Sequence, residues 1–363
     1  MPSIINHSVS LLRALYQQRV LRFAGLAVLV VGLGSLNARE QSGSGFFPGA
    51  VSVSSLQVPE GFPEPVFPEN NQFSEERWEL GKMLFYEKSL SVDRSTSCAS
   101  CHSPALSFAD DKATTPGAFD RPGKRNAPSL ANIAYHPYLL REGGVPTLEM
   151  QVLVPIQEEN EFDHNMVAIV EQLKENADYQ NRSQAAYGRP LDAFVLTRAL
   201  GVFQRTLLSG NSAYDQYQRQ PDALDAAQLR GMELFFSART NCSSCHSGFN
   251  FTNYGFANNG LYLTYPDEGR RRVTRSDQDE SVFKVPSLRN VAVTAPYMHD
   301  GSMQTLADVI AHYNSGGAAH PNKSELLHPL ELTQQEQDDL AAFLEALTDP
   351  SFLDDKRWGP PVE

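Results

Sequence analysis

All four cysteines of this chain lie in two copies of one five-residue pattern, which constrains the fold more than any other feature. The copies are Cys98-Ala99-Ser100-Cys101-His102 and Cys242-Ser243-Ser244-Cys245-His246. Two thiols at this spacing can add across the two vinyl groups of a haem, and the following histidine can then ligate the iron. The two patterns are too far apart for a four-cysteine zinc site, and no cysteine is left over. The sequence therefore predicts two c-type haems, rather than disulfides, a zinc site or a thioredoxin-like redox pair.

The surroundings of the two patterns repeat as well, which indicates an internal duplication. A Gly-x-x-Leu-Phe segment precedes each pattern, at Gly81 and at Gly231. A Pro-Ser-Leu-x-Asn segment follows each one, beginning at Pro128 and Pro286, and a Thr-Leu pair comes later, at 147–148 and 305–306. We expect a mainly α fold with two tandem cytochrome-c-like helical domains that carry one c-type haem each.

Each half is predicted to close with a helix. Residues 190–208 carry apolar side chains at nearly helical spacing. Thr333 and Glu336 form a capping-box pattern ahead of the apolar positions 340–347. Strand signals are few and short, and residues 255–264 are expected to form a loop.

The amino terminus has the pattern of an export signal. A basic segment ends at Arg22 and is followed by an apolar run over residues 23–36, which is short for a membrane-spanning helix. We expect a periplasmic protein, with an uncleaved anchor that tethers it to the membrane as the alternative. The predicted organisation is a signal peptide or anchor over 1–38, a linker over 39–59, an N-terminal haem domain over 60–215 and a C-terminal haem domain over 216–363.

The chain is acidic, with a formal net charge of −13. This balance argues against nucleic acid and anionic membrane surfaces as partners, and it permits a basic redox partner. The sequence leaves the choice between a monomer and a homodimer open.

Taken together, the paired haem motifs and three further segments resemble the bacterial di-haem cytochrome c peroxidase and MauG superfamily, over roughly residues 60–350. These segments are Asn126-Ala127-Pro128-Ser129-Leu130, Leu288-Arg289-Asn290 and Thr294-Ala295-Pro296-Tyr297-Met298-His299-Asp300-Gly301. The resemblance implies that the N-terminal haem, held by Cys98, Cys101 and His102, reacts with hydrogen peroxide. It implies that the C-terminal haem, held by Cys242, Cys245 and His246, handles electrons.

Three residues of the first half match the family's peroxide pocket. The resemblance assigns Glu161 as the proton shuttle, Gln151 as its hydrogen-bonding partner and Pro155 as a shape-determining residue beside the iron. The alternative is that Glu161 is one of several solvated acids in 158–161. Many relatives cap this iron with a histidine about sixteen residues after the first motif, but no histidine occurs from 103 to 135. We therefore expect the first iron to be open, as in MauG.

The second iron has several candidate ligands besides His246, namely Met298, Met303, His299, His312, His320, His328 and Tyr313. Tyr313 lies seven residues after Leu306, as Pro155 lies seven residues after Leu148, so both should face the distal side of their own haems. The same position holds Tyr in MauG. We expect Tyr313 to be the ligand, with Met298 or Met303 as alternatives, or with Tyr313 as a buried non-ligand. A phenolate stabilises oxidised iron, which suits a store of oxidising equivalents.

Two further predictions follow from the resemblance. Family members bind calcium between the haems, and Asn126, Thr294 and Pro296 match its ligands; the alternative is an ordinary turn. Arg141 falls where the family usually has a tryptophan that relays electrons between the haems, so Tyr138 or Tyr135 is the candidate relay.

The predicted function is that of a peroxide-dependent di-haem oxidoreductase. Its partners would be hydrogen peroxide and an electron donor, either a small c-type cytochrome or a cupredoxin. One alternative is MauG-like or MbnH-like oxidation of Trp or Tyr on a partner protein. Another is a non-catalytic di-haem electron carrier or sensor.

Overall fold

Short helices joined by long loops make up residues 54–361, the part of the chain that the structure, a computed structural model, describes. These residues belong to one compact unit, Val53–Glu363. The predicted signal segment, 1–38, and most of the predicted linker, 39–59, lie outside the described residues. Within 54–361, no helix is long and apolar enough to cross a membrane.

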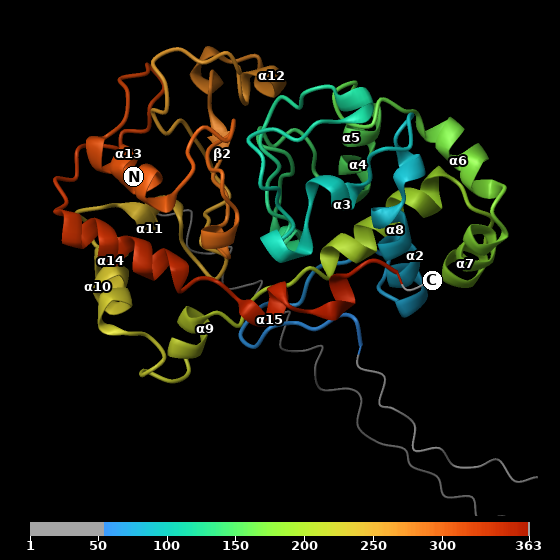
Figure 1. The fold of residues 1–363 in the computed structure, drawn as a ribbon, viewed down its shortest axis with the longest axis horizontal. Helices are drawn as coiled ribbons and strands as arrows, with labels where there is room; N and C mark the ends of the chain where they lie inside the picture. Colours follow the sequence, from blue (N-terminus) through green and yellow to red (C-terminus); the bar gives the residue numbers. More distant parts are fainter. Residues whose placement is uncertain (1–53, 362–363) are drawn as a thin grey trace, which may run out of the picture. The chain divides into compact units, whose positions relative to one another are not determined.

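The fold is mainly α, as expected (Figure 1). The α-helices are α2 (Glu75–Tyr86), α3 (Cys98–Cys101), α4 (Leu148–Gln151), α5 (Leu153–Gln157), α6 (Met166–Lys174), α7 (Ala177–Tyr187), α8 (Ala193–Arg205), α9 (Ala213–Tyr217), α10 (Ala226–Phe235), α11 (Cys242–Cys245), α12 (Arg271–Thr274), α13 (Leu306–Ser315), α14 (Gln334–Glu345) and α15 (Pro350–Leu353). Short 3-10 turns occur at Lys88–Leu90, Pro104–Leu106, Ala118–Asp120, Ile133–Tyr135, Asp277–Asp279, Val291–Val293 and Lys356–Trp358.

Strand structure in the described residues is limited to one small antiparallel sheet. Its strands are β1 (Phe256–Ala257) and β2 (Phe283–Lys284), with Phe256 opposite Lys284. Strand β1 begins inside the segment 255–264 that was expected to be a loop, so that expectation holds only in part.

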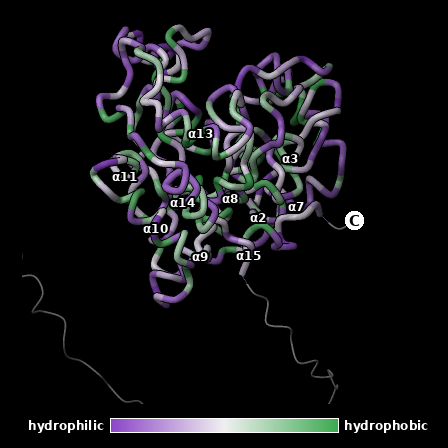
Figure 2. The backbone as a smooth tube through the Cα atoms, turned by 60° about the vertical axis from the view of Figure 1, so that its left-hand side comes forward, coloured by the Kyte–Doolittle hydropathy of each residue, from purple (hydrophilic) through white to green (hydrophobic). Residues whose placement is uncertain are grey.

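The same helix pair recurs in both halves, which explains the repeated Gly-x-x-Leu-Phe segment. Helix α2 packs against α8 in the first half, and α10 packs against α14 in the second. A Cβ atom on Gly81 would lie 2.0 Å from the carbonyl oxygen of Ala199, and one on Gly231 would lie 1.8 Å from that of Asp339. Only glycine therefore permits either close helix crossing. The hydrophobic residues concentrate inside, on α2 and α8 (Figure 2).

The predicted closing helices correspond to α8 and α14. Asp192 caps the start of α8, where its side chain accepts from the amide of Val195 at 2.9 Å. The capping box of Thr333 and Glu336 is present at the start of α14. Both helices bury their apolar stripes, which supply much of the core of each half.

The repeated asparagines join the two halves. Asn132 donates from Nδ2 to the carbonyl oxygen of Ser209 at 2.8 Å. Asn290 donates from Nδ2 to Ser209 Oγ and to Ser107 Oγ, both at 3.0 Å. Each asparagine has a positive φ of 58°, a conformation that asparagine tolerates better than most residues. The Pro-Ser-Leu-x-Asn repeat thus builds two equivalent turns that meet on the segment between the halves.

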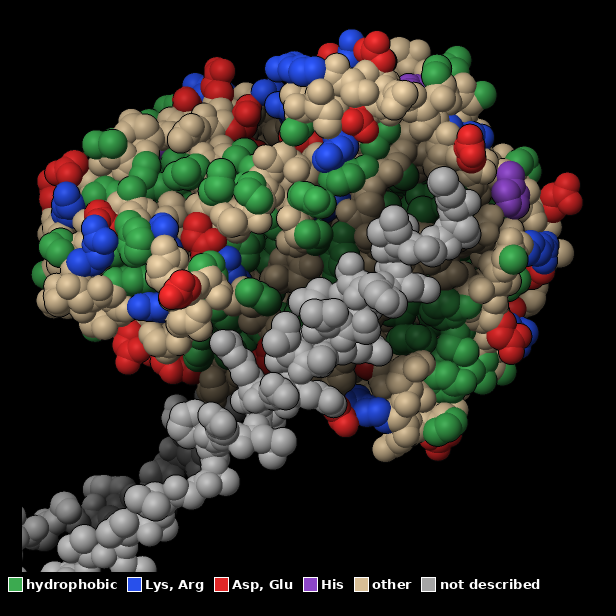
Figure 3. Space-filling model, turned by 180° about the vertical axis from the view of Figure 1, so that it is seen from behind, with side chains coloured by type: hydrophobic (Ala, Val, Ile, Leu, Met, Phe, Trp, Pro, Cys, Tyr) green, Lys and Arg blue, Asp and Glu red, His purple; other side chains and the backbone are tan. Residues whose placement is uncertain are grey.

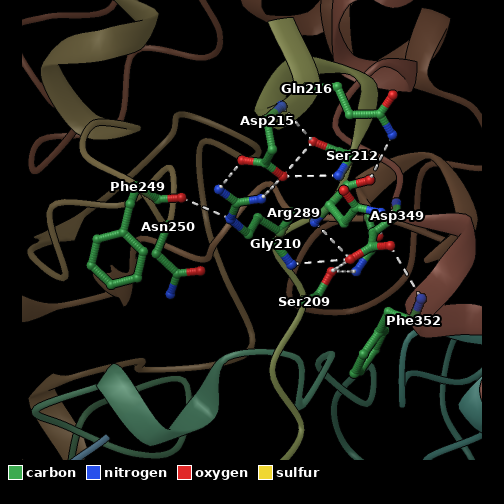
Figure 4. Close-up of polar contacts among 12 residues, drawn as sticks. Ser209, Gly210, Ser212, Asp215, Gln216, Phe249, Asn250, Arg289, Asp349 and Phe352 are labelled. Carbon is green, nitrogen blue, oxygen red and sulfur yellow. Dashed lines mark hydrogen bonds and ion pairs between the residues drawn. The ribbon is translucent and has the colours of Figure 1, made fainter. Parts of the chain in front are cut away.

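That connecting segment, residues 209–215, is held by two buried polar groups (Figure 4). The carboxylate of Asp349 accepts from the amides of Gly210 at 3.0 Å and Asn211 at 2.9 Å. The guanidinium of Arg289 pairs with Asp215 and also donates from Nε to the carbonyl oxygen of Phe249 at 2.7 Å. The connection between the halves is therefore fixed by many directional contacts.

The carboxyl-terminal segment crosses back to the first half. Phe352 and Trp358 are buried in the first hydrophobic core, where the Trp358 ring centroid lies 6.2 Å from that of Phe108 and 6.4 Å from that of Phe203. The predicted boundaries assign both residues to the second domain, so the core of the first half includes residues from beyond its predicted limits.

Candidate active site

Helix α3 presents the first haem motif. The helix begins after Ser97, whose backbone amide donates to Ser100 Oγ at 3.0 Å, and it places Cys98 and Cys101 one turn apart. His102 follows directly, and its Nδ1 atom lies 2.8 Å from the carbonyl oxygen of Phe108. A carbonyl oxygen only accepts, so Nδ1 carries the proton and Nε2 keeps a free lone pair.

Helix α11 repeats this arrangement at the second motif. Cys242 and Cys245 again lie one turn apart, and neither forms a disulfide. The Nδ1 atom of His246 lies 3.1 Å from the carbonyl oxygen of Phe251, which leaves its Nε2 free in the same way. Such a backbone contact fixes the tautomer and the ring orientation of a metal-ligating histidine.

The chemistry of both donor sets fits a c-type haem. Burial lowers the pKa of His102 and His246, which keeps the imidazoles neutral and able to bind a metal. Burial raises the pKa of the Cys98 thiol to about 12 and that of Cys101 to about 11. Thiol redox pairs instead need a lowered pKa. These side chains are half-buried. Figure 3 shows a hollow with hydrophobic side chains inside it.

Glu161 lies on a loop that folds back towards the first motif. Its amide donates to the carbonyl oxygen of Glu158 at 2.9 Å, and the next amide, of Phe162, donates to that of Pro155 at 3.1 Å. The carboxyl group lies close enough to Cys98 and Cys101 to raise the pKa of both thiols. Burial, and then the charge of Glu158, raise the pKa of Glu161 itself to about 7. The Glu161 side chain is nevertheless exposed to solvent, so its role as a proton shuttle stays a prediction.

The other two predicted pocket residues lie on the helices before this loop. Gln151 is the last residue of α4, and Pro155 lies in the middle of α5; both side chains are half-buried. The segment after the first motif packs on the Glu161 loop, since the amide of Ala118 donates to the carbonyl oxygen of Glu161 at 2.6 Å. The structure therefore brings the Glu161 loop against α5 and against the segment that lacks the capping histidine.

At the second motif, Tyr313 on α13 is the candidate ligand that faces the cysteines. Burial raises the pKa of Tyr313, and Cys242 and Cys245 add to this effect, while a hydrogen bond with Asn259 opposes it. The neighbouring His312 is directed elsewhere, because its Nε2 lies 3.0 Å from the carbonyl oxygen of Asn259.

The alternative ligands have other contacts. The sulfur of Met298 lies 3.2 Å from Asn259 Nδ2. The ring of His299 stacks on Phe283 with centroids 4.4 Å apart. The remaining candidates have contacts of their own. Met303 forms an isolated antiparallel β-bridge with Tyr297, and the ring of His320 packs against that of Tyr265. His328 lies beside the carbonyl oxygen of Pro329. The assignment of Tyr313 as the second ligand stays a prediction.

The predicted calcium ligands come together, but their arrangement does not fit calcium. The amide of Asn126 donates to the carbonyl oxygen of His299 at 2.9 Å, which brings Asn126 to the loop that carries Thr294 and Pro296. However, the Arg141 guanidinium donates to the carbonyl oxygen of Asn126 at 2.7 Å and to its Oδ1 at 2.8 Å. Calcium would need these oxygens at about 2.3–2.6 Å. The Arg141 guanidinium already contacts both oxygens, so this arrangement does not fit the ion, and calcium binding stays a prediction.

The residues around the expected relay position have structural partners. The Tyr138 side chain is 45% exposed and its ring lies 5.8 Å from that of Phe256, while its carbonyl oxygen accepts from Lys284 Nζ at 2.9 Å. Tyr135 donates to the carbonyl oxygen of Pro63 at 2.8 Å. A relay through either tyrosine stays a prediction.

Sequence reasoning missed Lys284, which reaches into the space between the halves. The repeat contained the signal, because Lys284 stands two residues before Pro286, as Asn126 stands two residues before Pro128. The two residues differ in chemistry, so the correspondence is visible only when the repeats are aligned on the prolines.

Comparison with known proteins agrees with this arrangement. The sequence profile of the family "Di-haem cytochrome c peroxidase" matches residues 75–223, and that of "Cytochrome c" matches residues 228–348. The methylamine utilization protein MauG of Methylorubrum extorquens is 35% identical over 303 residues, which are 82% of this chain and 84% of that protein. The cytochrome c551 peroxidase of Pseudomonas aeruginosa is 34% identical over 250 residues, 66% of this chain and 71% of that protein.

A solved structure has the same fold. It is the crystal structure of a MauG-like protein associated with microbial copper homeostasis, which superimposes with a TM-score of 0.80. The two chains are 34% identical, and the match covers 84% of this chain and 98% of that one.

Proposed function

The chain belongs to the di-haem cytochrome c peroxidase and MauG family, and from this premise we propose that its two haem sites are unequal. It is a di-haem oxidoreductase of the peroxidase type. Hydrogen peroxide would react at the haem held by Cys98, Cys101 and His102, and the second haem would store or relay the oxidising equivalents. When bound, the haems supply the electron transfer that reduces peroxide.

Glu161 supplies the proton transfer. A carboxylate beside the first haem motif can take a proton from the near oxygen of peroxide and return it to the far oxygen, which then leaves as water. With a pKa of about 7, the carboxyl group can both accept and release a proton at neutral pH. Gln151 supplies an amide donor to the developing negative charge, and Pro155 offers no ligating atom. The observation that carries the proposal is the Glu161 carboxyl group set beside Cys98 and Cys101.

At the second site, two protein side chains would hold the haem iron. His246 would be one ligand, and the phenolate of Tyr313 would be the other. The effect of Cys242 and Cys245 on the pKa of Tyr313 supports this choice. A phenolate favours oxidised iron, so the second site would hold an oxidising equivalent rather than admit electrons easily.

The electron donor is proposed to be a small c-type cytochrome or a cupredoxin in the periplasm. A net charge of −13 favours a donor with a basic face, because opposite charges speed encounter at low ionic strength.

Steady-state peroxide turnover with a reduced c-type cytochrome tests the proposal. Glu161→Gln keeps the shape of the side chain but removes the proton acceptor, and we expect kcat/KM for peroxide to fall by about 100-fold or more. Glu159→Gln, an exposed acid two residues away, is the matched control and should keep the wild-type rate. An unchanged rate in Glu161→Gln would remove the proposed proton shuttle.

Oxidation of a Trp or Tyr on a partner protein is the second candidate, and the position of Tyr313 favours it. It would use the same first site but no donor cytochrome. Rapid turnover with a reduced cytochrome or cupredoxin would support the peroxidase. If neither donor sustains turnover, while peroxide still changes the haem spectrum of the wild type but not of Glu161→Gln, protein oxidation would be favoured.

A further inference from the structure

Two cations lie between the halves without a carboxylate partner among residues 54–361. The Arg141 guanidinium contacts only the carbonyl oxygen and the side-chain oxygen of Asn126. The Lys284 ammonium contacts the carbonyl oxygen of Tyr138 at 2.9 Å and His136 Nδ1 at 3.0 Å. All of these partners are neutral, because burial lowers the pKa of His136 well below its ordinary value.

The nearby carboxylates are already engaged. Arg125 pairs with both Glu142 and Asp267. Asp300 accepts a hydrogen bond from the Tyr262 hydroxyl at 2.6 Å. Neither cation therefore has a protein anion in contact with it.

The backbones of Arg141 and Lys284 are also in direct contact. The amide of Lys284 donates to the carbonyl oxygen of Arg141 at 2.6 Å. Burial lowers the pKa of Arg141 to about 10 and that of Lys284 to about 8, and in the latter the charge of Arg141 adds to the effect. Both groups therefore stay charged at neutral pH. Both side chains are half-buried, and the charges of Asp300, Asp267 and Glu142 offset part of the positive charge of Arg141. An anion between or beside the two cations would stabilise them further.

The repeat places this pair between the two haem sites. The backbone carbonyl of Pro128 lies near the ring of His102, and that of Pro286 lies near the ring of His246. Asn126, which holds Arg141, and Lys284 stand two residues before these prolines. Arg141 therefore lies near the segment that contacts His102, and Lys284 lies near the segment that contacts His246.

We propose that Arg141 and Lys284 form a carboxylate-binding site that receives haem propionates, and that Arg141 replaces a divalent cation between the halves. Thioether formation consumes the haem vinyl groups but leaves two propionate carboxylates on each haem. A guanidinium and an ammonium are the donors that bind carboxylates most strongly. None of the hydrogen bonds within residues 54–361 uses Arg141 Nη1, so this atom is free to donate to such a group. The inference depends on haem loading and not on peroxide chemistry.

The first test is metal content. Holoprotein purified without added metal should contain much less than one calcium ion per chain by plasma mass spectrometry. Treatment with EGTA should leave its optical spectrum and thermal midpoint unchanged. One retained calcium per chain, with a spectrum that changes on EGTA treatment, would overturn the replacement of calcium by Arg141.

The second test examines the haems directly. In Arg141→Gln and in Lys284→Gln, the propionate bending bands of the resonance Raman spectrum should shift, because a hydrogen-bond donor to the carboxylate is lost. The reduction potential of at least one haem should fall, because a nearby positive charge favours the reduced state. Arg141→Lys keeps the charge and should retain most of the potential.

Arg182→Gln is the control, because it removes a surface cation that pairs with Asp178 at 3.0 Å and should change neither haem signal. Unchanged Raman bands and potentials in both Arg141→Gln and Lys284→Gln would overturn the carboxylate site. Neither readout involves peroxide, so this result would leave the proposed proton shuttle of Glu161 intact.

Discussion

Arg289 and Asp215 form a two-point ion pair, with Nη1 2.7 Å from Oδ2 and Nη2 2.8 Å from Oδ1 (Figure 4). The Arg289 side chain is only 1% exposed. It stands in the repeat segment of the second half, and Asp215 lies in α9, at the end of the connecting segment. The pair therefore fixes the connection to the second haem site.

Asp215→Asn should destabilise the holoprotein by about 3 kcal/mol, because it leaves a buried guanidinium without its counter-ion. Urea unfolding followed through haem absorbance measures this change in the free energy of unfolding. Asp178→Asn breaks the exposed pair with Arg182 and should cost less than about 1 kcal/mol. Equal losses in the two variants would show that burial does not strengthen the Arg289 pair.

The rate of peroxide reaction should depend on pH through Glu161. Burial, followed by Glu158, raises the pKa of Glu161 to about 7. Below that pH the carboxyl group is protonated and cannot accept the peroxide proton. We expect kcat/KM for peroxide to rise with pH and level off above about 7, falling roughly tenfold per unit at lower pH. This decrease of kcat/KM at low pH should be absent in Glu161→Gln. If the decrease persists in that variant, another group is responsible for it.

Tyr313→Met should raise the reduction potential of the second haem, because a thioether favours reduced iron more than a phenolate does. The shift should be a substantial part of the roughly 0.8 V range that axial ligands span. Met298→Leu should leave that potential and the optical spectrum unchanged. Spectroelectrochemical titration measures both, and a spectrum altered by Met298→Leu but not by Tyr313→Met would make Met298 the ligand.

The periodic and repeated features of the sequence predicted much of this fold. The apolar spacing before Leu208 and the capping box at Thr333 located α8 and α14 to within a few residues. The Gly81 and Gly231 segments marked two equivalent helix crossings. These signals are local, or are duplicated along the chain, so a single sequence displays them.

Contacts between distant segments could not be predicted in the same way. Nothing near Trp358 in the sequence indicates that it packs on Phe108. The contact between Arg141 and Asn126 was missed for a related reason. Family resemblance identified Asn126 as a metal ligand and Arg141 as a departure from a relay position, but only the fold shows that the two side chains are in contact.

The electron paramagnetic resonance spectrum of the air-oxidised holoprotein tests the central claim most directly. Unequal haem sites predict one high-spin ferric signal, from the haem with an open position opposite His102, and one low-spin signal, from the haem held by His246 and Tyr313. Two low-spin signals, with no high-spin species, would mean that a side chain closes the first iron, and would identify the protein as an electron carrier instead.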